Sequence, residues 1–96
     1  MSEYRLTERA ETEILEIFLD SIEMFGVIQA RRYKDELDYC FKLLAETPHM
    51  GRLAETLGSG VRRHEHKSHV ILYEQEANGI LVLALVPGRS VRQLKL

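Results

Sequence analysis

The chain has 96 residues, of which 45% are hydrophobic and 29% are charged. This composition predicts one folded domain over residues 1–96 with one hydrophobic core and excludes a disordered chain. The formal net charge of −2 argues against a protein that coats nucleic acid uniformly. The single cysteine has no partner for an internal disulfide, and neither a signal peptide nor a membrane-length apolar run occurs, so we expect a cytoplasmic protein.

The first half of the chain predicts a short strand followed by two helices. Residues 4–6 (YRL) form a short extended segment, and Thr7 is suited to cap a helix over residues 8–24. Apolar residues recur there at helical spacing in a broad stripe, which indicates more than one packing neighbour. Gly26 ends this helix, and a second helix follows over residues 27–46. Because the connection is so short, the two helices form an antiparallel hairpin.

The second half predicts strands. Residues 61–67 (VRRHEHK) form one strand, and residues 70–86 (VILYEQEANGILVLALV) form two strands joined by a type I′ turn at Asn78-Gly79. This turn places Tyr73 opposite Ala84. Alternation then sorts the hairpin into two apolar faces, one with Val70, Leu72, Leu81, Leu83 and Leu85 and the other with Ile71, Tyr73, Val82, Ala84 and Val86. The hairpin should therefore lie in the middle of a sheet and be covered on both sides.

The resulting element order is βααβββ, an α+β domain in which an N-terminal helical hairpin packs on one face of an antiparallel sheet. One helical layer can cover only one of the two apolar faces. Residues 86–96 form a basic amphipathic tail in which Val91, Leu94 and Leu96 alternate with Arg92 and Lys95. Either this tail or a partner protein has to cover the second face.

Three histidines raise the question of a metal site. His64 and His66 alternate along a predicted strand and His69 follows closely, but their spacing matches no specific zinc pattern and no cysteine completes a ligand set. Structural or solvent-facing histidines are the favoured interpretation, and we expect no metal and no cofactor. Cys40 lies in the apolar stripe of its helix, which favours a packed core thiol over a nucleophile.

Charge is distributed unevenly along the chain. Acidic residues outnumber basic ones up to residue 46, whereas basic residues lead beyond it, which suggests a directed electrostatic contact. The arginine pair Arg62-Arg63 and the tail residues Arg89, Arg92 and Lys95 could bind phosphates or carboxylates. An ion-paired or solvated face remains an equal alternative for the arginine pair.

Several short segments together suggest a family. They are Thr7 and Ala10 at the first helix start, Phe25-Gly26 at the helical turn, the segment 48–52, Gly60-Val61-Arg62-Arg63, and HVILY at 69–73 before Asn78-Gly79 and an apolar last strand. In this organisation the chain resembles the RelE/ParE toxin superfamily of bacterial type II toxin–antitoxin systems. It is most similar to the ParE branch, whose members inhibit DNA gyrase and are neutralised by a ParD-type antitoxin.

This resemblance implies a gyrase inhibitor that acts by binding and not by catalysis. Target contact is then expected at the tail residues Arg89, Arg92 and Lys95. A ParD-like antitoxin is expected to bring apolar side chains and acids to the groove between helices and sheet, with contacts at Arg62, Arg63, Leu81, Leu83 and Leu85.

Two alternatives stay open. The enzymatic branch of the superfamily cleaves messenger RNA on the ribosome with basic residues and a C-terminal tyrosine or histidine. Where many relatives carry His-x-Arg, this chain has Pro87-Gly88-Arg89, and residues 90–96 contain neither histidine nor tyrosine. Tyr73 lies within the hairpin, where a core aromatic is expected, so the usual agents of acid–base cleavage are missing. The second alternative is a relic that binds its antitoxin without harming the cell.

Overall fold

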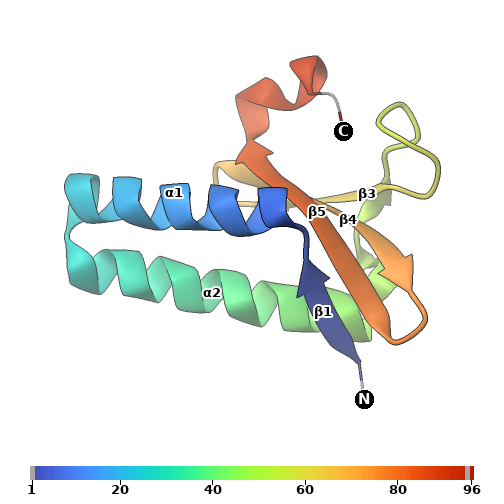
Figure 1. Cartoon of the computed structure of the whole chain (residues 1–96), viewed down its shortest axis with the longest axis horizontal. Helices are drawn as coiled ribbons and strands as arrows, with labels where there is room; N and C mark the ends of the chain where they lie inside the picture. Colours follow the sequence, from blue (N-terminus) through green and yellow to red (C-terminus); the bar gives the residue numbers. More distant parts are fainter. Residues whose placement is uncertain (1, 95) are drawn as a thin grey trace.

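The computed structural model describes residues 2–94 and 96, and its element order begins with a strand and a helical hairpin (Figure 1). The elements are β1 (Glu3–Leu6), α1 (Glu8–Phe25), α2 (Val27–Glu46), the 3-10 turn η1 (Pro48–Met50), β2 (Arg52–Leu53), β3 (Arg62–His66), β4 (His69–Glu76), β5 (Gly79–Pro87) and the 3-10 helix η2 (Gly88–Gln93). Neither helix is long and apolar enough to cross a membrane in this described part of the chain.

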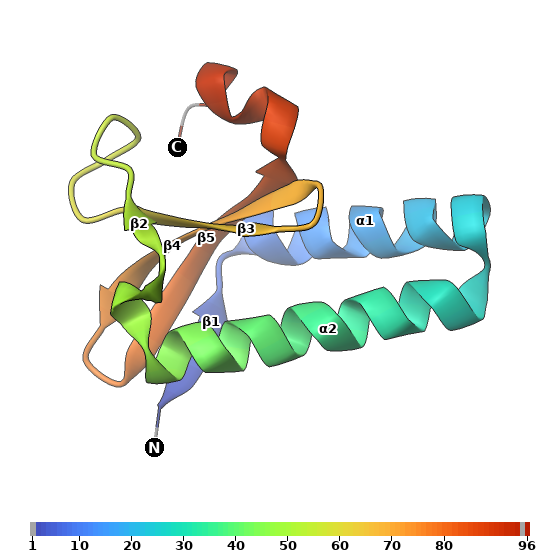
Figure 2. The same ribbon diagram turned by 180° about the vertical axis from the view of Figure 1, so that it is seen from behind.

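The α+β class and the helical hairpin are confirmed. The sheet has the order β1-β5-β4-β3-β2, and the helices pack on one side of it (Figure 2). Strands β2 to β5 are antiparallel neighbours, but β1 runs parallel to β5, so the sheet is mixed and not wholly antiparallel. The first strand thus borders the last one and forms an edge of the sheet.

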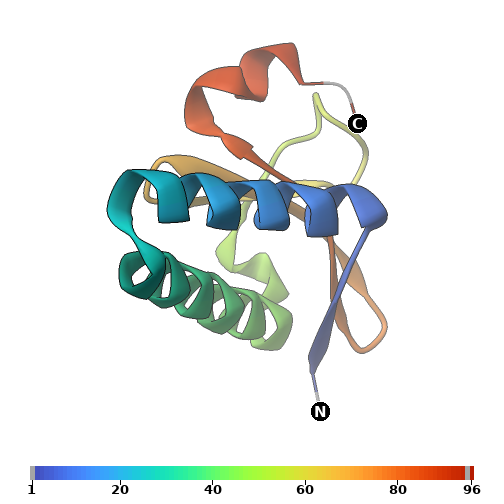
Figure 3. The ribbon, with the colours of Figure 1, turned by 60° about the vertical axis from the view of Figure 1, so that its left-hand side comes forward.

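Caps at both ends delimit α1 as the sequence predicts. The Thr7 side chain accepts a hydrogen bond of 3.0 Å from the N–H of Ala10, which satisfies one of the free donors in the first turn. At the other end the N–H of Gly26 donates to the carbonyl of Ile22. The chain then enters α2 directly, so the two helices lie antiparallel, as Figure 3 shows from the side.

The predicted register of the central hairpin is wrong. Glu76 pairs with Gly79, so Ala77 and Asn78 form the loop and Gly79 already belongs to β5. The glycine serves the neighbouring strand, because a side-chain carbon at this position would collide with the backbone of Glu3 in β1. Close approach of a parallel strand, and not turn geometry alone, therefore explains this glycine.

A β-bulge changes the faces of β5. Tyr73 pairs with Val82 but Leu72 pairs with Ala84, so Leu83 is an extra residue that shifts the alternation. Leu85 consequently lies on the helix side with Ile80 and Val82, opposite to the face that simple alternation predicts. Unbroken alternation of side chains along β5 would place Leu85 on the same face as Leu72, and the bulge is the reason why it does not.

The start of α1 binds the edge of β5 where β1 ends. Beyond Val82 no described strand pairs with this edge of β5, so its backbone N–H and C=O groups need other hydrogen-bond partners. The N–H of Thr7 donates to the carbonyl of Val82 and its hydroxyl donates to that of Leu83, at 3.1 and 2.9 Å. The carboxylate of Glu13 accepts the N–H of Leu85 at 3.0 Å. Helix α1 thereby satisfies the backbone groups around the bulge.

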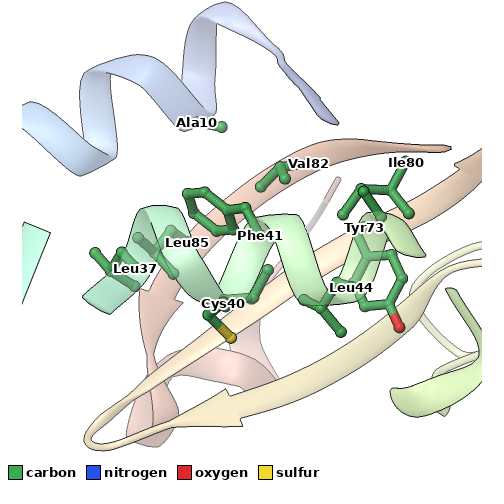
Figure 4. Close-up of a cluster of buried hydrophobic side chains, with 11 residues drawn as sticks. Ala10, Leu37, Cys40, Phe41, Leu44, Tyr73, Ile80, Val82 and Leu85 are labelled. Carbon is green, nitrogen blue, oxygen red and sulfur yellow. The ribbon is translucent and has the colours of Figure 1, made fainter. Parts of the chain in front are cut away.

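Two hydrophobic clusters fill the two faces of the sheet. The first lies between helices and sheet (Figure 4) and contains Ala10, Leu37, Cys40, Phe41, Leu44, Ala45, Ile71, Tyr73, Ile80, Val82 and Leu85. The second lies on the opposite face and contains Val61, Val70, Leu72, Ala84, Val86 and Val91. Val91 belongs to η2, so the tail does fold back over the second face, where Ala54, Leu57 and Leu94 also pack.

Tyr73 is a core aromatic, as predicted. Its ring is fully buried, and its hydroxyl donates to the carbonyl of Pro48 at 2.7 Å and accepts the N–H of Gly51 at 2.9 Å. A side-chain carbon at Gly51 would collide with this hydroxyl. One side chain therefore ties the segment after α2 to the middle of the sheet.

Replacing Tyr73 by phenylalanine should lower the free energy of unfolding by about 1–3 kcal/mol, because the buried carbonyl of Pro48 and N–H of Gly51 lose their partner. Denaturant unfolding measures this change. Tyr39→Phe is the matched control, since Tyr39 is 64% exposed. Equal unfolding midpoints for the two variants would contradict the structural role of the hydroxyl.

Replacing Glu13 by alanine should also destabilise the fold, by about 1–3 kcal/mol, since the N–H of Leu85 is left without its acceptor. Glu16→Ala on the exposed surface of the same helix gains the same helix propensity and breaks no such bond. The difference in unfolding free energy between the two variants measures the contact with the bulge together with the ion pair of Glu13 with Arg9, which contributes about 0.3–0.5 kcal/mol. A Glu13 variant as stable as the Glu16 variant would show that the contact contributes nothing.

Candidate interaction surfaces

The basic tail presents its arginines from an anchored segment. Val91 is only 7% exposed and packs in the second cluster, whereas Arg89 and Arg92 on either side of it are exposed. Neither arginine forms an ion pair with another described residue. Lys95, the third predicted target-binding residue, lies outside the described residues. The cationic side chains of Arg89 and Arg92 are thus exposed to solvent on a segment that is anchored by Val91.

The two tail arginines line different hollows. Arg89 borders a pocket of about 520 Å³ with the end of α1, including Met24 and Phe25, and with His69. Arg92 borders a second pocket of about 450 Å³, which also contains Arg52 and Arg63. The structure therefore does not bring Arg89 and Arg92 to one site.

Of the predicted antitoxin contacts, the arginine pair takes part in bonds within the chain. The guanidinium of Arg62 donates to the carbonyl of Gly51 at 2.7 Å and lies 2.8 Å from Nδ1 of His49. Arg63 forms an ion pair of 3.1 Å with Glu65. The Arg62 contacts hold β3 to the segment after α2, whereas the Arg63–Glu65 pair lies within β3 and supports the ion-paired alternative for Arg63.

Glu65 is shared between two arginines. Its carboxylate pairs with Arg52 as well as Arg63. Burial would raise its pKa, but the hydrogen bond from Arg52 and the two positive charges outweigh burial and hold the pKa below its ordinary value. One carboxylate thus partly compensates two guanidinium groups.

The three predicted leucine contacts do not form one exposed face. Leu85 is 1% exposed and belongs to the first cluster, so the prediction that it contacts an antitoxin is wrong. Leu83 is half-buried beside the second cluster and Leu81 is half-buried near the turn. Contacts of Leu81, Leu83, Arg62 and Arg63 with a partner stay predictions.

The helical hairpin carries an apolar groove that the residue predictions missed. Between α1, α2 and β1 lies a hollow of about 630 Å³ lined by Tyr4, Leu6, Ile14, Leu15 and Phe18, with Glu11, Arg31, Lys34, Asp35 and Asp38 around it. Leu15 and Leu19 are more than half exposed on α1. The breadth of the apolar stripe was the available sequence signal, since it is wider than one packing neighbour requires.

The histidines make structural contacts. The hydroxyl of Tyr33 lies 2.9 Å from Nδ1 of His69, and His66 lies 3.8 Å from Glu36, whose carboxylate pairs with Lys67 at 2.7 Å. Burial lowers the pKa of both histidines and raises the pKa of Tyr33 to about 12. These residues attach α2 to the turn between β3 and β4. No group of three His, Cys, Asp or Glu side chains could hold a metal in residues 2–94 or at residue 96.

Groups suited to acid–base or nucleophilic chemistry are mostly committed to the core. Both polar bonds of the Tyr73 hydroxyl go to backbone groups, and burial raises the pKa of the Cys40 thiol. Two imidazoles lie near guanidinium groups instead: His69 lines the same hollow as Arg89, and the exposed His49 lies 2.8 Å from Arg62. His69 begins β4 and Arg89 follows the end of β5, so the pairing of His69 with Pro87 brings the two residues together.

A solved structure shares the fold of this chain. The chain is similar to a structure described as the chromosomal ParDE TA system from P. aeruginosa, with a TM-score of 0.74 over 91% of this chain and 96% of that one. The sequence identity is 17%, so this likeness concerns the fold alone. The two chains thus share one architecture.

Sequence comparison then identifies the family. The model of the ParE toxin of type II toxin–antitoxin systems (parDE) matches residues 4–92. Toxin ParE1 of Caulobacter vibrioides is 40% identical over 73 residues, covering 76% of each chain. Toxin ParE1 of Mycobacterium tuberculosis is 29% identical over 80 residues, covering 83% of this chain and 82% of that protein. The chain belongs to the ParE toxin family.

Proposed function

We propose that this toxin inhibits DNA gyrase by binding and that a ParD-like antitoxin neutralises it. One observation carries the binding mode: η2 holds Arg89 and Arg92 exposed and without ion-pair partners among the described residues, while Val91 between them is anchored in the second cluster. An anchored segment loses little conformational entropy when a partner binds it. Cations held in this way suit a complex of gyrase and DNA, which is rich in negative charge.

The groove on the helical hairpin is the proposed antitoxin site. Its floor is apolar and aromatic through Tyr4, Leu6, Leu15 and Phe18, while both signs of charge surround it. An amphipathic helix can bury apolar side chains in such a groove and place its charges at the rim. This proposal keeps the expected groove between helices and sheet, but it moves the main apolar contacts from the hairpin leucines to α1.

The hollow that contains His69 and Arg89 supports one alternative function. An imidazole near a guanidinium could supply the proton transfer and phosphate binding of an RNA endonuclease. We favour the binding mode because residues 90–96 contain neither histidine nor tyrosine, the groups that would exchange a proton in the enzymatic branch. An assay of gyrase inhibition and an assay of messenger-RNA cleavage decide between the two functions.

Purified chain should inhibit DNA supercoiling by gyrase, and Arg89→Glu should weaken this inhibition by roughly tenfold or more, because a charge reversal replaces attraction by repulsion. Lys42→Glu, at an exposed position of α2, controls for the change in net charge. The readout is the toxin concentration that halves supercoiling.

The alternative predicts a different result. If added toxin leaves gyrase active but cleaves messenger RNA on translating ribosomes, and if His69→Gln or Arg89→Ala abolishes cleavage, the chain is an endonuclease and the binding proposal is wrong. A chain that binds the antitoxin but shows neither activity is a relic.

Replacing Leu15 by glutamate should weaken antitoxin binding by roughly tenfold or more, because the variant places a charge in the apolar floor of the groove. Leu19→Glu is the matched control: Leu19 is 54% exposed and Leu15 56%, both on α1, but only Leu15 lines the groove. Titration calorimetry with the cognate antitoxin measures both affinities. Equal losses for the two variants would place the contact on the outer surface of α1 instead.

A further inference from the structure

Three arginines from distant parts of the sequence line one pocket. They are Arg52 of β2, Arg63 of β3 and Arg92 of η2, and the pocket has a volume of about 450 Å³. Figures 1 and 2 show η2 and the loop after β2 on the same side of the sheet. From the tail, Val91, Arg92 and Leu94 line the pocket. The groove proposed for the antitoxin helix lies elsewhere, between α1, α2 and β1.

The positive charge of this arginine pocket exceeds its compensation. Glu65 pairs with both Arg52 and Arg63, whereas Arg92 has no ion pair within the described residues, and no acidic side chain lines the pocket. In addition, Nε of Arg63 is buried and lacks a hydrogen-bond partner among those residues. An unsatisfied buried donor is unfavourable, and a guanidinium group that turns toward an anion gains an acceptor. The pocket is therefore suited to a carboxylate or a phosphate.

The uncharged part of the lining distinguishes between these two anions. It consists of Leu53, Ala54, Thr56, Leu57, Val91 and Leu94 and contains no aromatic ring. Leu53 is 54% exposed. Single-stranded nucleic acids bind largely through bases stacked on aromatic side chains, and such a platform is missing here. An aliphatic surface beside guanidinium groups instead matches a peptide with aliphatic and acidic side chains.

We propose that the arginine pocket binds an acidic peptide segment of the protein partner, with a carboxylate between the guanidinium groups and an aliphatic side chain on the leucine surface. The inference rests on the proposed function in that an antitoxin supplies this partner. The peptide occupies Arg92, which also belongs to the tail that we propose for target contact. A single partner segment thus covers one of the two exposed tail arginines directly.

A peptide titration tests this proposal with the full chain. A fluorescein-labelled hexapeptide that alternates leucine and glutamate is followed by fluorescence anisotropy at about 50 mM salt, where electrostatic contacts are weakly screened. The counterpart with glutamine in place of glutamate should bind at least about tenfold more weakly. Arg92→Gln and Arg63→Gln should each weaken the acidic peptide by at least about fivefold, whereas Lys42→Gln should leave its affinity unchanged.

Each other outcome overturns the proposal. Equal binding of the two peptides shows that charge is not recognised, and an unchanged affinity for Arg92→Gln shows that the pocket is not the site. Arg92 is exposed and has no ion pair among the described residues, so this variant tests binding even if Arg63→Gln weakens the fold. A single-stranded DNA of equal charge that displaces the peptide at lower concentration assigns the pocket to nucleic acid. The gyrase assay is independent, so its failure leaves this result intact.

Discussion

The contact between the start of α1 and the bulged edge of β5 organises the molecule. Because β1 ends at Leu6, the edge of β5 beyond Val82 has no strand partner, and Thr7 and Glu13 supply one through three hydrogen bonds. The same contact fixes the direction of α1 across the sheet, and α2 follows through the tight turn at Gly26. The bulge at Leu83 also decides which side chains of β5 meet the helices. A one-residue irregularity therefore determines both hydrophobic clusters.

Local signals made the elements predictable, whereas the register depended on contacts between distant segments. The cap at Thr7, the end of α1 near Gly26 and the helical periodicity of α2 are properties of neighbouring residues, and the structure agrees with them. No neighbouring residue indicates the position of the bulge, because Leu83 and Leu85 are chemically alike. Their backbone groups differ only in their distant partners: Thr7 binds the carbonyl of Leu83, and Glu13 binds the N–H of Leu85. Gly79 correctly indicated a turn, but a glycine is required there because β1 passes too close to leave room for a side chain. The site predictions failed at Leu85 for the same reason, while the exposure of Arg89 and Arg92 followed from the amphipathic tail.

Covering both sheet faces within one short chain leaves few residues for function. Tyr73, Cys40 and the residues around His66 and His69 are used to join segments. The described surface carries, among other features, a set of arginines near the tail and an apolar groove on the helical hairpin. The Arg92 pocket lies on the face of the sheet opposite the helices, whereas the apolar groove and the Arg89 hollow both border α1. A ParE-family protein of this shape can consequently offer its target and its antitoxin separate contacts, and a long partner can reach both.

The pairing of the first strand with the last has a consequence for synthesis of the protein. Thr7 and Leu83 are 76 residues apart, and contacts at such separation form late, because the intervening chain has to be ordered around them. During translation β1 and both helices leave the ribosome long before β5 exists, so the first hydrophobic cluster cannot close. The tail arginines are made later still. A truncated or stalled chain thus lacks both its completed sheet and its cationic end, so the target contact that we propose for the tail requires a finished molecule.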